Sequence, residues 1–230
     1  VVGKVPDLYT GGYEIYTTLD ANQQREATQA LRRGLIKYDR DHGYRGPEGQ
    51  VPDALLAQIE QLYSEATSSN AAEFADDTAT RAASAASAAV EVDAESTERD
   101  ADPIAVLAQA LQQRLDERDT YAEQIPAVVL RVEDKRALVF ASDLGNGEVQ
   151  LADSRWARRY LSVDERGPRI RQMSDILQVG DIVRVNPRQV AGAGSAPTWL
   201  LTQLPDIQGA LIAMDPQNGA VRALVGGYDF

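Results

Sequence analysis

Five short β-type runs, separated by turn residues, constrain the fold of this chain more than any other feature of its sequence. Each run is rich in Val, Leu, Ile, Thr or aromatic residues, which favour strands. The runs cover residues 127–132, 136–142, 148–152, 182–185 and 198–203. Turn residues punctuate the first three, at Asp134-Lys135 and at Gly145-Asn146-Gly147. Five strands in about 75 residues, with a longer excursion after the third, have the count and layout of a small, partly open β-barrel.

Three helices are predicted before the barrel. Asp20 is expected to cap a helix over about residues 21–40, which follows a strand over residues 13–19. Pro52 and Pro103 stand at first-turn positions of two further helices. Asp102 is the expected cap of the last one. The apolar stripes of these two helices are expected to pack into the core and consist of Leu55, Ile59, Leu62 and Tyr63, and of Ile104, Leu107, Ala108, Leu111 and Leu115.

The last segment, GALIAMDPQNGAVRALVGGYDF (residues 209–230), predicts a β-hairpin. Two apolar runs flank the turn sequence Pro216-Gln217-Asn218-Gly219. A hairpin this apolar needs a larger sheet to bury it. We therefore expect it to belong to an incomplete domain, with the rest of the sheet beyond Phe230.

The stretch from Glu65 to Asp102 dominates the charge of the chain. The formal net charge is -12, and ten acidic against two basic residues give this stretch -8. Thirteen of its residues are Ala, and Phe74, Val90 and Val92 are its only large apolar side chains. So little apolar surface does not offset the entropy of the chain, and a surface insertion without a packed core is predicted. An acidic docking tail is the alternative.

Composition excludes several kinds of chemistry. The chain has no Cys and a single His, His42, which rules out disulfides, thiolate-ligated zinc, a Cys nucleophile and a His-rich metal site. No cofactor or metal site is predicted. No run reaches the roughly 18 apolar residues of a transmembrane helix. Because the chain starts at Val1 without Met or a signal peptide, it is interpreted as an excised piece of a longer protein.

The segment from Arg155 to Arg171 is the candidate binding surface. Six Arg against two acidic residues give it a local charge of +4, with aromatic residues between them. One interpretation is a connector in which Trp156 and Leu161 plug the barrel while the arginines pair with nearby acids. The other is an exposed surface for a partner protein, because Arg, Trp and Tyr are favoured interface anchors. The candidate contact residues for that surface are Arg155, Arg158, Arg159 and Tyr160.

The strand layout is that of OB-type barrels, which bind oligosaccharides or single-stranded nucleic acid. Nucleic acid of this kind stacks its bases on aromatic side chains. Residues 103–205 have 13 basic and 13 acidic residues, and the aromatic residues of the barrel are only Phe140, Trp156, Tyr160 and Trp199. Nucleic acid is therefore not expected as a partner. A stand-alone OB-type module for oligosaccharide or single-stranded nucleic acid is kept as the alternative function.

Three parts of the chain together resemble class A penicillin-binding proteins, the bifunctional peptidoglycan synthases. GGYEIYTTLDANQQREATQALRRGL, residues 11–35, resembles the linker strand and helix between that family's glycosyltransferase and transpeptidase domains. Residues 209–230 resemble the opening hairpin of its transpeptidase domain. Between them, YDRDHGYRGP, RWARRYL, GPRIRQMSDILQVGD and PTWLLTQLP resemble the OB-like insertion of the Gram-negative 1A subtype. The acidic insertion departs from this pattern.

Pattern and resemblance together predict an α+β fold. It consists of a small OB-like β-barrel with flanking helices, a linker strand and helix, and a C-terminal β-hairpin from an incomplete domain. The expected division is a linker over residues 1–50, a helical insertion over 51–125 with the acidic stretch at about 65–102, an OB-like domain over 126–206, and the first transpeptidase hairpin over 207–230.

The catalytic motifs of the family are absent from the chain. Its transpeptidase nucleophile is the Ser of a Ser-x-x-Lys motif. In this chain the residues three positions before the only lysines are Val1, Gly34 and Val132, none of which is Ser, and there is no Lys-Thr-Gly. The chain is therefore expected not to be an enzyme by itself, although the parent protein would be a glycosyltransferase and serine-type DD-transpeptidase.

The resemblance implies a non-catalytic accessory region that spaces the two catalytic domains. It implies that the parent protein lies at the periplasmic face of the inner membrane. Contact with the membrane is then expected only through an N-terminal anchor outside this chain. The implied partners are the other domains of the same parent chain and an outer-membrane lipoprotein activator.

Overall fold

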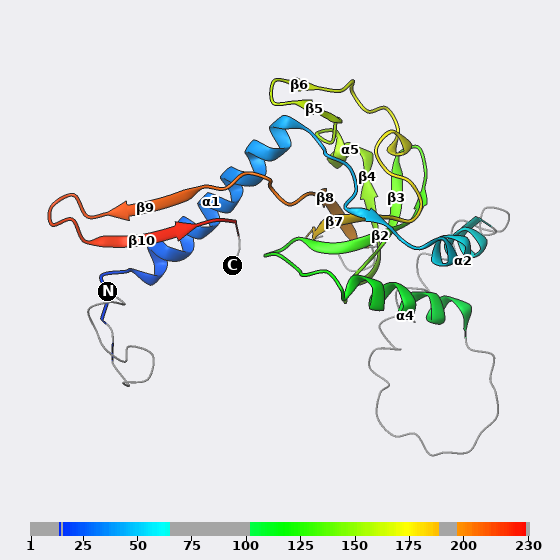
Figure 1. The fold of residues 1–230 in the computed structure, drawn as a ribbon, viewed down its shortest axis with the longest axis horizontal. Helices are drawn as coiled ribbons and strands as arrows, with labels where there is room; N and C mark the ends of the chain where they lie inside the picture. Colours follow the sequence, from blue (N-terminus) through cyan, green and yellow to red (C-terminus); the bar gives the residue numbers. More distant parts are fainter. Residues whose placement is uncertain (1–13, 15, 65–101, 189–196, 229–230) are drawn as a thin grey trace, which may run out of the picture. The chain divides into compact units, whose positions relative to one another are not determined.

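The computed structural model describes residue 14 and residues 16–64, 102–188 and 197–228. The chain divides into two compact units, which we describe separately (Figure 1). The barrel unit covers residues 36–206, and the hairpin unit covers residues 1–35 together with 207–228. Except for Asp102, the acidic stretch lies outside the described residues, so the predictions for it stay predictions.

A closed five-stranded barrel forms the centre of the barrel unit. In spatial order its strands are β7 (Asp181–Pro187), β2 (Ile125–Val132), β3 (Arg136–Ala141), β4 (Gly145–Gln150) and β8 (Thr198–Thr202). β8 pairs in parallel with β4 and antiparallel with β7, which closes the ring. The five predicted strands are confirmed, but the barrel is closed rather than partly open because its last strand has a partner on both edges. The short strand β1 (Gly49–Gln50) pairs with the first two residues of β7, Asp181 and Ile182.

The strand β4 differs from its predicted limits at both ends. Gly145 to Gly147 belong to the strand, and the preceding turn centres on Asp143, whose φ is 61°. The strand ends at Gln150, and the short helix α5 (Leu151–Ser154) begins at the next residue. Packing requires glycine at position 147, because a Cβ there would lie 1.4 Å from Nε1 of Trp199. The glycine therefore gives the indole room against the strand.

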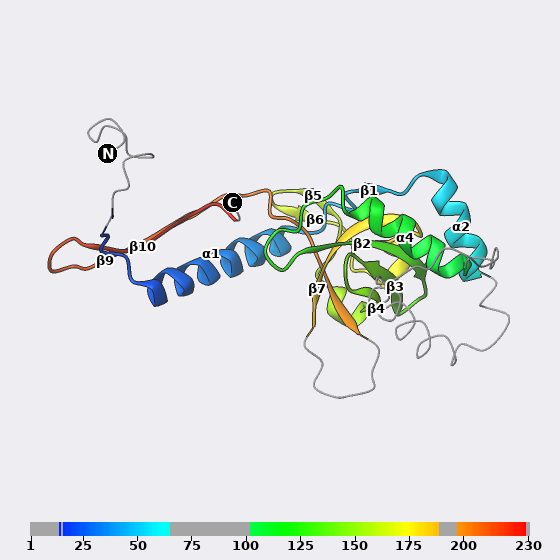
Figure 2. The same cartoon turned by 90° about the horizontal axis from the view of Figure 1, so that it is seen from below.

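Two hydrophobic clusters cover the two faces of the barrel wall. One fills the barrel interior, and the other lies between the barrel and the helices α2 (Asp53–Ser64) and α4 (Pro103–Leu115). Strand β2 contributes to both, with Val129 in the first cluster and Val128 and Leu130 in the second. Figure 2 shows α2 and α4 side by side along the barrel. The predicted core role of the helical stripes is confirmed for Ile59, Leu107, Leu111 and Leu115.

The predicted cap of α4 is also confirmed, because the Asp102 carboxylate accepts the backbone N–H of Ile104 at 3.0 Å. Both α2 and α4 belong to the same compact unit as the barrel. The finer division of the chain into four parts stays a prediction.

The hairpin unit is built from β9 (Ala210–Met214), β10 (Val221–Gly226) and the first part of α1 (Ala21–His42). The two strands pair antiparallel around the predicted turn, in which Gly219 has a φ of 72° and donates its N–H to the Asp215 carbonyl. Asp20 caps α1 as predicted, accepting the backbone N–H groups of Asn22 and Gln23.

The N-terminal strand predicted over residues 13–19 is not regular in its described part. Residues 14 and 16–19 are assigned no strand, although the Thr18 hydroxyl donates to the Val221 carbonyl at 2.7 Å. On the hairpin itself, Ile212, Met214 and Leu224 are each more than half exposed. The prediction that a further sheet covers the hairpin stays a prediction.

Candidate partner-docking surface

The candidate surface is an arm, residues 155–171, that follows α5 (Figure 1). Its strands β5 (Tyr160–Ser162) and β6 (Glu165–Arg166) form a small antiparallel hairpin, separate from the barrel sheet. The chain then returns to the barrel through the short 3-10 helix η2 (Met173–Asp175), where Met173 is fully buried. All of these residues lie in the barrel unit.

Trp156 and Ala157 anchor the arm at its base. The Trp156 ring packs edge-on against Tyr44, with 5.9 Å between ring centroids, and the Arg40 guanidinium lies 4.8 Å from the Trp156 ring. Ala157 is fully buried. The predicted packing of Trp156 against the barrel core is confirmed. The same prediction is wrong for Leu161, which is 50% exposed because it lies in the projecting hairpin.

Backbone hydrogen bonds tie the arm to the segment after α1. The N–H of Tyr44 donates to the Arg158 carbonyl at 2.7 Å, and the N–H of Tyr160 donates to the Tyr44 carbonyl at 2.8 Å. Gly43 has a φ of 109°, and a Cβ there would lie 2.7 Å from the Arg158 carbonyl oxygen. Only glycine combines this backbone conformation with this close approach.

Arg158 is used within the arm itself. Its Nε donates to the Gly167 carbonyl at 2.6 Å, and its Nη2 donates to the Arg166 carbonyl at 3.3 Å. The side chain is half-buried. Arg158 therefore holds the two ends of the hairpin together, since its own backbone precedes β5 while its guanidinium bonds to the carbonyls of Arg166, the last residue of β6, and of Gly167.

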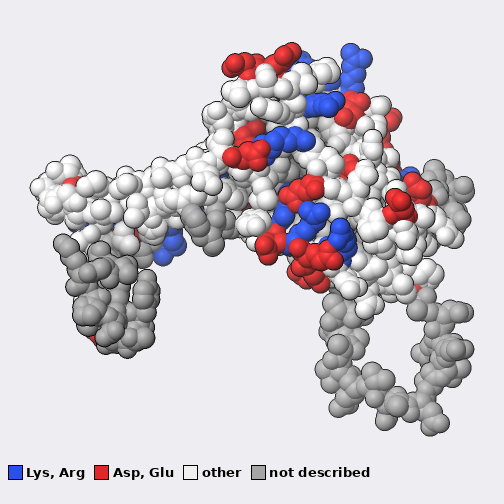
Figure 3. Space-filling model, viewed as in Figure 1, with Lys and Arg blue, Asp and Glu red and all other residues white. Residues whose placement is uncertain are grey.

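The other three candidate residues are exposed. Arg155, Arg159 and Tyr160 lie on the surface, and the neighbouring Leu161 and Val163 are 50% and 62% exposed. Within the described ranges, none of these arginines forms an ion pair with an acidic side chain. Figure 3 shows both acidic and basic side chains over the region of β5 and β6. The arm therefore presents apolar area together with unpaired guanidinium groups, rather than a surface of one charge.

Sequence reasoning missed a buried polar cluster beside the base of the arm. Asp39 is 4% exposed, and its carboxylate accepts from Arg45 Nη1 at 2.5 Å and from Gln203 Nε2 at 2.6 Å. Gln203 also donates to the Gly43 carbonyl and accepts the N–H of Arg45. This cluster fixes the segment after α1 against the residue after β8. Asp39 and Gln203 are 164 positions apart, so no local pattern could have revealed their contact.

Neither a metal site nor a membrane-spanning helix is found in residues 16–64, 102–188 and 197–228. Within these ranges no group of three or more His, Asp or Glu side chains is placed to hold a metal ion. No helix in the same ranges is long and apolar enough to cross a membrane.

Known proteins resemble the chain in both sequence and fold. Residues 94–207 match the family described as penicillin-binding protein OB-like domain. The chain is 33% identical to penicillin-binding protein 1A of Vibrio cholerae over 96% of its length, and 33% identical to that of Pseudomonas aeruginosa over 97%. It is 32% identical to penicillin-binding protein 1A of Escherichia coli K12 over 96% of its length. It spans about a fifth of these relatives, namely 21%, 20% and 20% of their lengths.

A crystal structure of penicillin-binding protein 1A from Haemophilus influenzae has a similar fold, with a TM-score of 0.53 at 20% identity. The match covers 95% of this chain and 22% of that one. The sequence, the closed barrel and these comparisons agree with one another. The chain therefore belongs to the penicillin-binding proteins, with their OB-like domain at residues 94–207.

Proposed function

We propose that this chain is the non-catalytic accessory and regulatory region of a bifunctional peptidoglycan synthase. In this role it spaces the glycosyltransferase and transpeptidase domains of the parent protein and docks a partner protein through the arm. The observation that supports the proposal is the arm itself, an exposed hairpin that is fixed at its base. Within the residues that the structure describes, its outer arginines form no ion pair with an acidic side chain. Exposed Arg and Tyr side chains next to apolar ones are typical of protein–protein interfaces.

The residues of the arm divide into two roles. Arg155, Arg159 and Tyr160 contact the partner, and Leu161 and Val163 add apolar area at the tip. Arg158 positions the arm, because its guanidinium already bonds to the carbonyls of Gly167 and Arg166. The partner that fits this surface carries acidic groups around an apolar recess. An outer-membrane lipoprotein activator in the periplasm is our candidate, with the parent protein held at the inner membrane.

The absence of the transpeptidase motifs supports the non-catalytic part of the proposal. Without Ser-x-x-Lys there is no activated serine to open a β-lactam ring. We expect the chain to form no covalent adduct with a fluorescent penicillin under conditions in which a complete penicillin-binding protein is labelled. A labelled band would contradict this expectation.

Nucleic acid fits the barrel less well than a protein partner does. Stacking of bases needs exposed aromatic rings, but Phe140 and Trp199 are only 7% and 4% exposed. Of the aromatic residues in the arm, Trp156 packs against the core and Tyr160 alone is exposed.

The docking proposal is tested by reversing the charge of the arm. The chain is immobilised and challenged with purified periplasmic lipoproteins, and the affinity of each binder is compared for the wild type and the double variant Arg155→Glu/Arg159→Glu. Because like charges placed together in an interface cost several kcal/mol, we expect the variant to bind at least about tenfold more weakly. The matched control is Arg33→Glu, at an exposed position of α1 outside the arm. Unchanged binding by the double variant would refute the assignment.

A further inference from the structure

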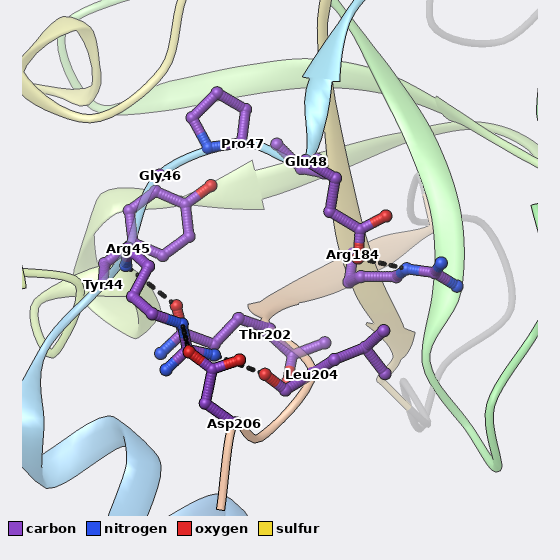
Figure 4. A pocket seen from close by; sticks show the side chains of 11 residues that line it. Tyr44, Arg45, Gly46, Pro47, Glu48, Arg184, Thr202, Leu204 and Asp206 are labelled. Carbon is purple, nitrogen blue, oxygen red and sulfur yellow. Dashed lines mark hydrogen bonds and ion pairs between the residues drawn. The ribbon is translucent and has the colours of Figure 1, made fainter.

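The basic side chains of the barrel unit fall into two groups. Outside the arm, eight of them pair with an acidic side chain at 3.3 Å or less. Figure 4 shows one such pair, in which Arg184 lies against the Glu48 carboxylate. In the arm, Arg155, Arg159 and Arg169 are exposed and form no ion pair with any described side chain. Most of the unpaired positive charge of the described barrel unit therefore lies on these three unpaired arginines.

The other arginines of the arm already have neighbours. Arg158 bonds to two backbone carbonyls. Arg166 acts electrostatically on the carboxylate of Asp41, and Arg171 acts on that of Asp175, although neither forms an ion pair. The three unpaired arginines are therefore the groups of the arm that an anionic ligand reaches without displacing a carboxylate.

The three unpaired arginines lie toward the base of the arm. A Cβ on Gly167 would lie 3.2 Å from the Cβ of Arg159, so the segment that leads to Arg169 runs back past Arg159. The acidic residues of the arm, Asp164 and Glu165, lie at the other end of the hairpin, around its turn. An acidic ligand is therefore attracted to the base of the arm and repelled from its tip.

The acidic stretch of the same chain carries the complementary charge. Its last residue, Asp102, is already used, because its carboxylate caps α4. The rest of the stretch, residues 65–101, has nine acidic against two basic residues, which gives it a net charge of -7. It follows α2, which ends at Ser64, and precedes α4, which begins at Pro103. Both helices belong to the barrel unit, so the chain tethers this charge to the unit that carries the arm.

The length of the stretch lets it reach the arm from both of its ends. The middle of residues 65–101 is about 18 residues from either helix, which corresponds to at most about 60 Å of extended chain. A unit of this size has a radius of gyration of about 15 Å, and is thus about 40 Å across. A tether of this length gives an effective concentration on the order of millimolar. Even weak attraction then produces substantial occupancy.

We propose that residues 65–101 bind to the arm of their own chain, with their carboxylates on Arg155, Arg159 and Arg169. Single exposed ion pairs contribute little, so several carboxylates act together and the contact is sensitive to salt. The stretch thereby competes with the acidic partner protein for the same arginines. The competition with that partner rests on the proposed function, whereas binding of the stretch to the arm does not.

The experiment places a nitroxide spin label in the acidic stretch of the whole ¹⁵N-labelled chain and follows the broadening of amide NMR signals. Because the chain has no Cys, Ala94→Cys provides a single attachment point between two acidic residues. At about 20 mM salt, where the Debye length is about 20 Å, we expect broadening at residues 155–171. At about 0.5 M salt, where the Debye length is about 4 Å, most of this broadening should disappear.

Charge reversal shows whether the arginines hold the stretch. Arg155→Glu/Arg159→Glu should abolish the broadening of the arm. The matched control Arg25→Glu/Arg33→Glu makes the same change in charge at exposed positions of α1 and should keep it. An arm that is not broadened, or one whose broadening survives its own charge reversal, would overturn the proposal. Broadening that arises only between copies would also overturn it, and is detected by mixing ¹⁵N-labelled chain with unlabelled chain that carries the nitroxide.

The competition is measured with a defined acidic probe, a peptide of ten glutamates. A variant in which the nine acidic residues of 65–101 are replaced by their amides keeps the length of the stretch and removes its negative charge. We expect the peptide to bind this variant about two- to tenfold more tightly than the wild type, because more of its arms are free. In the Arg155→Glu/Arg159→Glu background the same neutralisation should change the affinity little. Equal affinity for the wild type and the neutralised variant, or an equal gain in both backgrounds, would refute competition at the arm.

Discussion

Replacement of Leu111 by Ala tests whether the helices α2 and α4 fold as one unit with the barrel. Leu111 is 1% exposed and packs in the cluster formed by α2, α4 and the outer face of the barrel wall. Leu→Ala changes in such cores cost about 2.7–5.0 kcal/mol, depending on how far the site can collapse. Here the surrounding side chains come from two helices and a sheet that is closed into a barrel, which limits collapse. We expect a loss of about 3–4 kcal/mol in the free energy of unfolding.

The assay follows unfolding with two signals at once. Tryptophan fluorescence reports on the barrel unit, which contains Trp156 and Trp199, and far-UV circular dichroism reports largely on the helices. We expect both transitions of Leu111→Ala to move together, by about 10 °C in thermal unfolding. The control Val106→Ala, at a position of α4 that is 49% exposed, should change stability by less than about 0.5 kcal/mol.

Separation of the two signals would refute the reasoning. If Leu111→Ala lost helical signal early while the tryptophan transition stayed in place, α2 and α4 would be an appended subdomain rather than part of the barrel's core.

Three further variants test other parts of the fold. Gly147→Ala places a Cβ 1.4 Å from Trp199 Nε1, so we expect overpacking to lower the free energy of unfolding in urea by about 1–3 kcal/mol. Its control, Gly34→Ala, has open space around it in α1 and should raise the free energy of unfolding by up to about 1 kcal/mol. Equal effects of the two variants would contradict the packing argument. Burial raises the pKa of Asp181 above 3.8, so its contribution to stability is fully present below pH 3.8 and is lost as the pH rises through the raised pKa. The free energy of unfolding of Asp181→Asn minus that of the wild type should therefore increase between pH 3.8 and the raised pKa, and then level off. A difference that stays constant from about pH 3.5 to about 7 would contradict this.

The sequence predicted those parts of the fold that depend on local patterns. The five strands, the two N-caps and the hairpin turn each depend on residues within a few positions of one another, and the structure confirms them. The strand limits were harder, because a tertiary contact decides them. Gly147 is of a residue type that is common in turns, but it belongs to β4. It is glycine because the Trp199 ring occupies the space that a side chain would fill.

The arm and the polar cluster show where local patterns end. The sequence indicated an arginine-rich surface, but not that Arg158 would turn back onto the carbonyls of Gly167 and Arg166. Nor did it indicate that Leu161 would project outward. The cluster of Asp39 and Gln203 depends on the way the chain returns after β8, which no periodicity encodes.

The most direct test of the central claim uses the full-length protein, which we propose to be a bifunctional peptidoglycan synthase. The glycosyltransferase and transpeptidase rates that we propose for it are measured with and without any lipoprotein found to bind this chain, for the wild type and for Arg155→Glu/Arg159→Glu. An accessory, non-catalytic region that docks a regulator predicts unchanged basal rates and loss of the partner's effect in the variant. A fall in the basal rates, or an undiminished effect of the partner, would contradict it.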